Sequence, residues 1–82
     1  MSVTHLTCRI YEDFLCALSE TYGQKPFTLA DLAEKGLHLP GKRTLKFFQL
    51  RGVVEVARAG RPHQWRVSAE CRAYLEKRRR AA

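Results

Sequence analysis

The spacing of the apolar residues changes at Gly52, from that of helices to that of strands, and this change limits the folds open to the chain. Before Gly52 the apolar residues recur every three or four positions, as in amphipathic helices, whereas residues 53–58 and 63–67 follow the pattern of strands. A two-stranded hairpin is marginal in isolation, so this one must pack on the helices. A chain of 82 residues has room for one core. The sequence therefore predicts one α+β domain, mainly helical, that spans residues 1–82.

Four helices are expected, and each has a recognisable start or stop signal. Gly23 and Gly36 follow apolar stripes at positions where glycine commonly ends a helix. Thr28 and Ser68 precede such stripes and can cap the first turn with their hydroxyls. The expected helices run from about Thr4 or Thr7 to Tyr22, from the cap at Thr28 to Gly36, from about Pro40 to Arg51, and from the cap at Ser68 through Leu75. The first helix should bury the stripe Leu6, Ile10, Phe14 and Leu18.

The hairpin predicted after the third helix has its turn at Gly60. Side chains along a strand point alternately to its two faces. This alternation places Val54, Val56, Trp65 and Val67 on the buried face and leaves Arg58, Arg61 and Arg66 on the exposed side or at the tip.

The excess positive charge of the chain is confined to its second half. Residues 1–41 carry three basic and five acidic side chains, a net charge of −2, whereas residues 42–82 carry twelve basic and three acidic ones, a net charge of +9. Part of this charge lies in residues 77–82, which we expect to form a fraying basic tail beyond an ordered part at about 4–76. Such an asymmetry is typical of a chain with an anionic partner.

No arrangement of residues for catalysis or for cofactor binding is evident. The glycines are isolated, so there is no phosphate-binding loop, and no nucleophile, base and orienting group can be assigned. His5 and Cys8 could share a helix face, but two ligands do not hold a metal ion. The cysteines Cys8, Cys16 and Cys71 are odd in number and include no C-x-x-C pair, so we expect them to be reduced and to pack as small hydrophobic side chains.

The apolar stretches are too short to span a bilayer, and the N-terminus lacks the features of a signal peptide. We therefore expect an intracellular protein, cytoplasmic or nucleoid-associated. It should be a non-enzyme without a cofactor, a metal or a small-molecule ligand.

The third helix should be polar and cationic on the side that faces away from the core. At the helical period, Leu45 and Phe48 turn towards the core. The other side carries donors that can pair with phosphates or base edges: Lys42, Arg43, Lys46 and Gln49. Leu50 falls near this strip, where it could pack under the hairpin or contact a partner.

The order helix, short helix, basic helix, hairpin, helix resembles the winged helix-turn-helix family of DNA-binding domains. The resemblance spans residues 28–75. It is carried by Leu32-Ala33-Glu34 with Gly36, by Leu45, Phe48, Gly52, Val53, Val54 and Glu55, by Gly60-Arg61, and by Trp65-Arg66-Val67-Ser68. Gly41 departs from the family pattern, which usually has a branched apolar residue at the start of the recognition helix. Glycine there should loosen or delay the first turn of that helix.

The resemblance implies that the third helix enters the major groove of double-stranded DNA and that the hairpin, the wing, contacts the DNA beside it. The residues it implicates are Lys42, Arg43, Lys46 and Gln49 in the groove, Arg58 and Arg61 on the wing, and Arg66 on the exposed side of the wing. Arginine and glutamine can read bases through paired hydrogen bonds, whereas lysine more often neutralises phosphate. The implied function is that of a small transcriptional regulator.

Other partners stay open at this point. The basic face could instead dock on an acidic protein, as a winged helix interaction module. RNA is less favoured, because the aromatic side chains fall on core faces rather than where they could stack on bases. A homodimer could form through the first and fourth helices, with Tyr11, Tyr22 and Tyr74 at the interface, or these tyrosines could cover the core with their hydroxyls in water.

Overall fold

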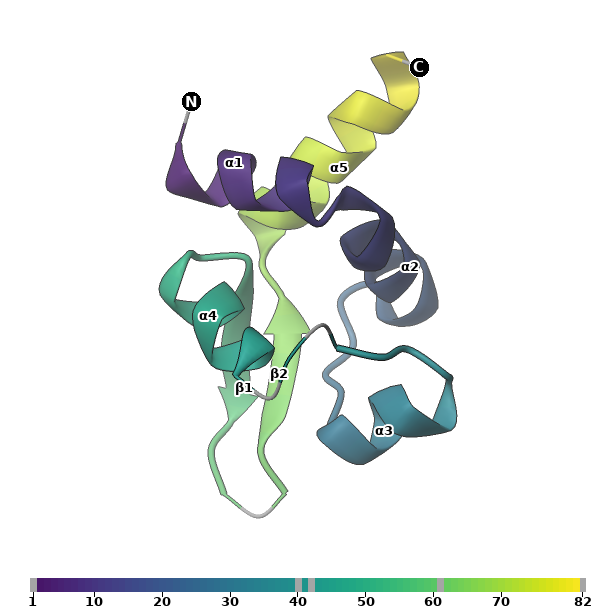
Figure 1. The fold of residues 1–82 in the computed structure, drawn as a ribbon, viewed down its shortest axis with the longest axis vertical. Coiled ribbons are helices and arrows are strands. Elements are labelled where there is room, and N and C mark those ends of the chain that lie inside the picture. The colour runs from purple at the N-terminus through teal and green to yellow at the C-terminus, as the bar shows by residue number, and fades with distance from the viewer. Residues whose placement is uncertain (1, 40, 42, 61, 82) are drawn as a thin grey trace.

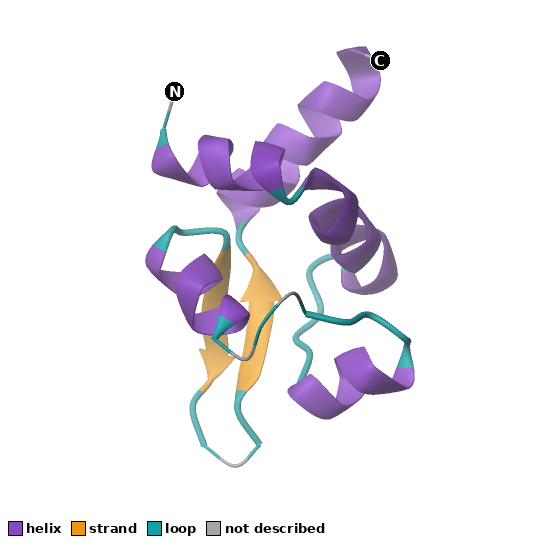
Figure 2. Ribbon diagram, in the orientation of Figure 1, coloured by secondary structure: helices purple, strands orange, loops and turns teal. Residues whose placement is uncertain are grey.

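The computed structural model describes residues 2–39, 41, 43–60 and 62–81. Within these residues the chain forms five α-helices and a two-stranded antiparallel sheet (Figure 1, Figure 2). The elements are α1 (Val3–Ile10), α2 (Glu12–Tyr22), α3 (Leu29–Glu34), α4 (Thr44–Leu50), β1 (Val54–Arg58), β2 (Gln64–Val67) and α5 (Ala69–Ala81). The prediction of a small, mainly helical α+β domain is confirmed.

The elements are arranged around one core. Helices α1 and α5 lie against each other at the end of the molecule opposite the hairpin tip, and α4 lies against β1 (Figure 1). The buried hydrophobic residues form a single cluster: Cys8, Leu15, Leu18, Phe27, Leu32, Leu45, Phe48, Val53, Val54, Val67, Cys71 and Leu75. All elements contribute to this cluster, so the hairpin is stabilised by the helices, as its length requires.

The prediction of one long first helix is wrong, because the chain breaks into α1 and α2 at Tyr11. The backbone of Tyr11 leaves the helical region (φ −108°, ψ 30°), and its ring packs edge-on against Phe48 with the ring centroids 5.1 Å apart. The break turns α1 relative to α2, so the predicted apolar stripe does not continue through it. Leu6 and Ile10, expected in the core, are 49% and 66% exposed.

Helix α1 instead buries Thr4, Thr7 and Cys8. The Thr7 hydroxyl donates to the Val3 carbonyl at 2.8 Å, and the Thr4 hydroxyl donates to the Arg51 carbonyl at 2.7 Å. Because both hydroxyls keep a hydrogen bond, their burial carries little desolvation penalty. The polar side of α1 can therefore face the core while its aliphatic side faces solvent.

Helix α3 begins and ends where the sequence predicts. The Asp31 backbone N–H donates to the Thr28 hydroxyl at 3.1 Å, and the Thr28 N–H donates to the Asp31 carboxylate at 2.9 Å, which completes a capping box. Gly36 has a φ of +71° and ends the helix, after which the Leu37 N–H donates to the Leu32 carbonyl at 2.9 Å. These local bonds define a helix that is too short to persist by propensity.

Helix α4 begins at Thr44, later than predicted, and Pro40 lies outside the described residues. The Thr44 hydroxyl closes a turn on Gly41: it donates to the Gly41 carbonyl at 2.8 Å and accepts from the Gly41 N–H at 2.9 Å. The delayed start agrees with the expectation from glycine at this position. The conformational freedom of Gly41 favours this turn over a further turn of helix.

The hairpin has the predicted faces, and its register is regular up to an irregularity between Val56 and Arg58. Its paired residues are Val54 with Val67, Glu55 with Arg66, and Val56 with Trp65. The four side chains predicted on the buried face are all buried or half-buried. Phe27, just before α3, exchanges two backbone hydrogen bonds with Trp65, at 2.8 and 2.9 Å. The segment that leads into α3 is thereby attached to the outer edge of β2.

Helix α5 starts at the predicted cap and continues further than expected. The Cys71 N–H donates to the Ser68 hydroxyl at 3.1 Å. The helix then includes the basic residues 77–80 and reaches Ala81, where a fraying tail was expected. Two of its arginines form ion pairs with α2, described below.

Candidate nucleic-acid interface

Helix α4 presents three exposed polar side chains away from the core: Arg43 at its N-cap, then Lys46 and Gln49. Leu45 and Phe48 are buried on the opposite side and anchor the helix in the core. These exposed residues belong to the strip predicted for the third helix. Lys42, the fourth member of the predicted strip, lies outside the described residues.

Leu50 lies on this exposed side of α4 and is 77% exposed, so it does not pack under the hairpin. Beside it, the Arg51 guanidinium stacks over the Phe47 ring at 5.2 Å from the centroid. Arg51 was not among the residues predicted for the site. The i, i+4 spacing of Phe47 and Arg51 was the available signal, because side chains at this spacing are neighbours on a helix.

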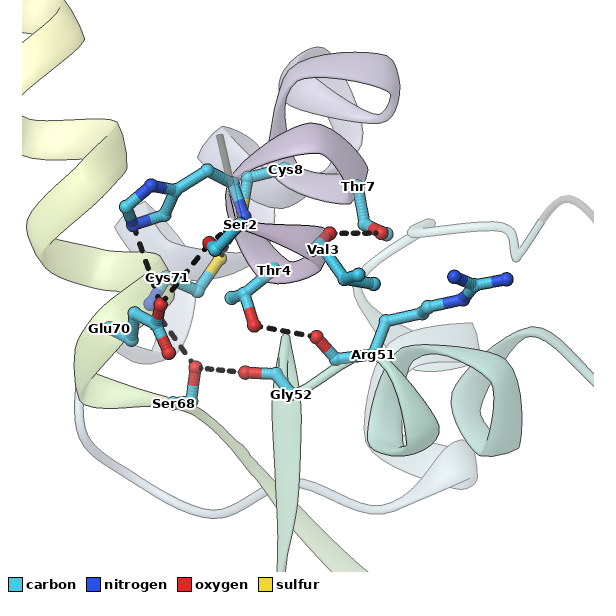
Figure 3. A network of polar contacts seen from close by, with 11 residues as sticks. Ser2, Val3, Thr4, Thr7, Cys8, Arg51, Gly52, Ser68, Glu70 and Cys71 are labelled. Atoms are coloured by element: carbon cyan, nitrogen blue, oxygen red, sulfur yellow. Dashed lines mark hydrogen bonds and ion pairs between the residues drawn. The ribbon is translucent and has the colours of Figure 1, made fainter.

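The C-terminal end of α4 is held by hydroxyls from two other elements (Figure 3). Thr4 of α1 donates to the Arg51 carbonyl at 2.7 Å, and Ser68, the cap of α5, donates to the Gly52 carbonyl at 2.7 Å. Carbonyls at a helix C-terminus have no partner within the helix, so these two bonds satisfy groups that would otherwise need water. The orientation of α4 is thus set by the first and last helices together.

Strand β1 starts just after α4 and runs back beside it, so the far end of β1 approaches the N-terminal end of α4 (Figure 1). Arg58 is exposed at that far end. No ion pair between described residues involves Arg43, Lys46 or Arg58. We call Arg43, Lys46, Gln49 and Arg58 the α4–hairpin surface. Arg61, predicted at the hairpin tip, lies outside the described residues.

Arg66, also predicted as a site residue, is engaged within the hairpin. Its Nε donates to the Glu55 carboxylate at 2.9 Å, across the strand pair. A cross-strand pair between half-exposed side chains contributes modest stability, but it offsets the charge that a phosphate would meet. Arg66 is therefore less available for an anionic ligand than the α4–hairpin surface.

The basic end of α5 faces acidic residues of the first half of the chain. Arg78 contacts the Glu12 carboxylate at 2.9 Å, and Arg79 contacts Glu20 at 3.6 Å, both on α2. Arg80 contacts Glu76 within α5 at 2.7 Å. The hydrogen bond and the charge of Glu12 raise the pKa of Arg78. Part of the charge asymmetry in the sequence is therefore matched inside the molecule.

The described basic residues of the second half of the chain do not form one continuous surface. The end of α5 lies at the opposite end of the molecule from the hairpin tip (Figure 1). The α4–hairpin surface is therefore separate from the basic run 77–80.

The tyrosines predicted for a dimer interface pack within the domain. Tyr11 lies on Phe48, Tyr22 lies 5.3 Å from Phe27, and Tyr74 stacks on His5 at 4.8 Å. The Tyr22 hydroxyl is buried without a hydrogen-bond partner among the described residues, and burial raises the pKa of Tyr22. The Tyr22 hydroxyl therefore does not extend into water, which was the alternative expected for these tyrosines.

In the part of the chain that the structure describes, no group of three or more His, Cys, Asp or Glu side chains is placed to hold a metal ion. The helices of that part do not combine the length and the apolar character needed to cross a bilayer. Comparisons with protein-family models, curated proteins and solved structures gave no match to this chain.

Proposed function

We propose that this chain is a winged helix-turn-helix domain that binds double-stranded DNA and acts as a small transcriptional regulator. One observation carries the proposal: Arg43, Lys46 and Arg58 are exposed and unpaired among the described residues, whereas three basic residues of α5, Arg78, Arg79 and Arg80, each contact a carboxylate. Cations without a partner are the ones that can neutralise phosphates and release their counterions.

The roles of the residues follow from their donor groups. An α-helix fits the major groove of B-DNA, and the exposed side of α4 would face the base edges there. Arg43 carries paired donors and Gln49 carries a donor and an acceptor, both suited to base edges, whereas Lys46 is suited to a phosphate. Arg58 would contact the backbone beside the groove. The clamp from Thr4 and Ser68 would keep α4 at a constant angle to the hairpin, so both could be engaged at once.

The salt dependence of binding tests this proposal. In a fluorescence anisotropy titration of a random duplex, we expect log affinity to fall with log salt at a slope of about −5 if about six phosphates are neutralised. Lys46→Gln should lower the size of the slope by about 1, because one phosphate contact is lost. Lys77→Gln on α5 removes the same charge away from the α4–hairpin surface and should leave the slope unchanged. A flat dependence, or equal effects of the two variants, would contradict the proposal.

A second candidate is a protein interaction module that docks on an acidic partner. Leu50 favours it, because it lines a surface hollow together with Val3 and Phe47, and contiguous exposed apolar patches mark protein contacts. The same side chain could contact a thymine methyl group in the major groove. Absence of duplex binding at low salt, together with binding of an acidic peptide that is lost in Leu50→Ser, would favour this candidate.

We further propose that two copies associate through α1. Val3, Leu6 and Ile10 are exposed along one side of this helix. At one end of this exposed apolar row, Val3 and Arg51 line a surface hollow. At the other end, Ile10 lines a second hollow together with Arg9 and Asp13. Two α1 helices packed antiparallel about a two-fold axis would place Val3 against Ile10 and bring Arg51 towards Asp13 of the second copy.

Light scattering at two concentrations measures this association. We expect the apparent mass to rise towards that of a dimer at the higher concentration, and Leu6→Gln to abolish the rise by placing an amide in the apolar contact. Leu29→Gln is the matched control, because Leu29 is similarly exposed but lies on α3. A monomer at both concentrations, or equal effects of the two variants, would contradict the proposed dimer.

A further inference from the structure

The first and last helices bring two cysteines into contact inside the core. The Sγ atoms of Cys8 on α1 and Cys71 on α5 are 2.9 Å apart and share a hydrogen bond, although the residues are 63 positions apart in the chain (Figure 3). Both side chains are fully buried. Buried, reduced cysteines were expected from the sequence, but the contact between these two was not predicted. Cys16, on α2, is half-buried and makes no such contact among the described residues.

We propose that Cys8 and Cys71 are an oxidation site, at which a hydroperoxide converts the two thiols into a disulfide that joins α1 to α5. The sulfurs need to move from 2.9 Å to the bond length of about 2.05 Å. A shift of less than about 1 Å is within the adjustment that two packed helices can make.

The reaction balances with hydrogen peroxide as the two-electron oxidant. The Cys8 thiolate attacks one peroxide oxygen, the O–O bond breaks, and the departing hydroxide takes up a proton to become water. The product is a sulfenic acid on Cys8. The Cys71 sulfur then attacks the Cys8 sulfur, the S–O bond breaks, and the leaving hydroxide takes the Cys71 proton. One peroxide is reduced to two waters while two thiols become one disulfide.

The order of the two steps follows from the environment of each sulfur. The hydrogen bond from Cys71 lowers the pKa of Cys8, whereas the same bond, together with burial, raises the pKa of Cys71. In the closed fold Cys8 therefore has more thiolate character than Cys71, which favours Cys8 as the sulfur oxidised first and Cys71 as the one that completes the disulfide. Because both thiols are buried, a small oxidant reaches them through local opening of the packing between α1 and α5.

A disulfide at this position would also affect how the end of α4 is held. Helix α1 supplies Thr4, and α5 begins at Ser68, the two residues whose hydroxyls hold the Arg51 and Gly52 carbonyls. A covalent bond between Cys8 and Cys71 joins the two elements that hold the end of α4 (Figure 3). It also closes a loop of most of the chain, which restricts the unfolded state.

Peptide mapping of the wild-type protein tests the proposal directly. Trypsin cleavage places the three cysteines in separate peptides, residues 1–9, 10–35 and 67–72. After treatment with hydrogen peroxide and alkylation of free thiols, we expect peptides 1–9 and 67–72 to be recovered as one linked species, lighter by two hydrogens and separated again by dithiothreitol. Recovery of both as alkylated thiols or sulfinic acids, or a link that involves peptide 10–35, would overturn the proposal.

Thermal unfolding provides a second measurement. In Cys16→Ser, which removes the third thiol, the oxidised form should melt about 20 °C above the reduced form. Cys71→Ser should show no oxidant-dependent shift. If Cys71→Ser fails to fold, the peptide map of the wild-type protein still decides. An oxidised Cys16→Ser that melts with the reduced form would overturn the link between α1 and α5. Neither measurement involves DNA, so the outcome is independent of the proposed function.

Discussion

Changing Arg43, Lys46 and Arg58 together to glutamate should weaken duplex binding about 1000-fold at low salt. Each reversal removes a phosphate contact and adds a carboxylate that repels the backbone. All three side chains are exposed, so the variant should fold with nearly unchanged stability. Fluorescence anisotropy with a random duplex measures the loss of affinity, and circular dichroism checks the fold.

A second triple variant tests whether the position of the substituted charges, rather than the change in net charge, lowers the affinity for DNA. Lys77, Arg79 and Arg80 are exposed on α5, and their change to glutamate lowers the net charge of +7 by the same amount. We expect this control to lose less than about tenfold in affinity, since charges more than a Debye length from the duplex are screened. If the two triple variants bind equally weakly, net charge alone drives binding. If the first binds like the wild type, the α4–hairpin surface is not the site.

Replacing Gly52 with alanine should lower the free energy of unfolding by about 3 kcal/mol. Gly52 has a φ of +75°, which L side chains rarely adopt, and a Cβ there would lie 2.7 Å from the Thr4 hydroxyl oxygen. That hydroxyl donates to the Arg51 carbonyl, so the substitution displaces α1 from the end of α4. Urea unfolding followed by circular dichroism measures the change.

Gly36→Ala is the matched control for this substitution. Gly36 has a similar φ, +71°, but a Cβ there would have nothing within 4 Å. It should cost about 1 kcal/mol, from the backbone conformation alone. The difference between the two variants measures the close approach of α1 to the end of α4. If both variants lose the same free energy of unfolding, Thr4 can move away from the new Cβ without loss of stability. The hydrogen bond from Thr4 to the end of α4 would then contribute little to stability.

Features that depend on neighbours in the sequence were predicted correctly. The capping box of Thr28 and Asp31 and the Ser68 cap involve residues three positions apart, so the residue types alone define them. The faces of the hairpin follow from strict alternation along each strand. The delayed start of α4 follows from the glycine at position 41, which disfavours a helical turn.

The charge pattern was only half readable from the sequence. The positions of the charged residues in the sequence predicted an acidic first half and a basic second half. From this asymmetry we inferred an anionic partner. Which cations are left for a partner depends on distances across the fold, such as those from Arg78 to Glu12 and from Arg79 to Glu20. Those distances follow from the packing of α5 beside α2, which no local pattern encodes. Of the predicted site residues, Arg66 proved to be paired and Lys42 and Arg61 lie outside the described residues.

The sequence by itself determined the order of the elements, the caps of α3 and α5 and the alternating faces of the hairpin, because each depends on backbone preferences and hydrogen bonds within a few residues. Only the tertiary structure decided the break at Tyr11, the burial of Thr4 and Thr7 and the meeting of Cys8 with Cys71. The physical reason is that a side chain can be buried on either side of a short helix once its polar atoms find partners, and those partners come from distant parts of the chain.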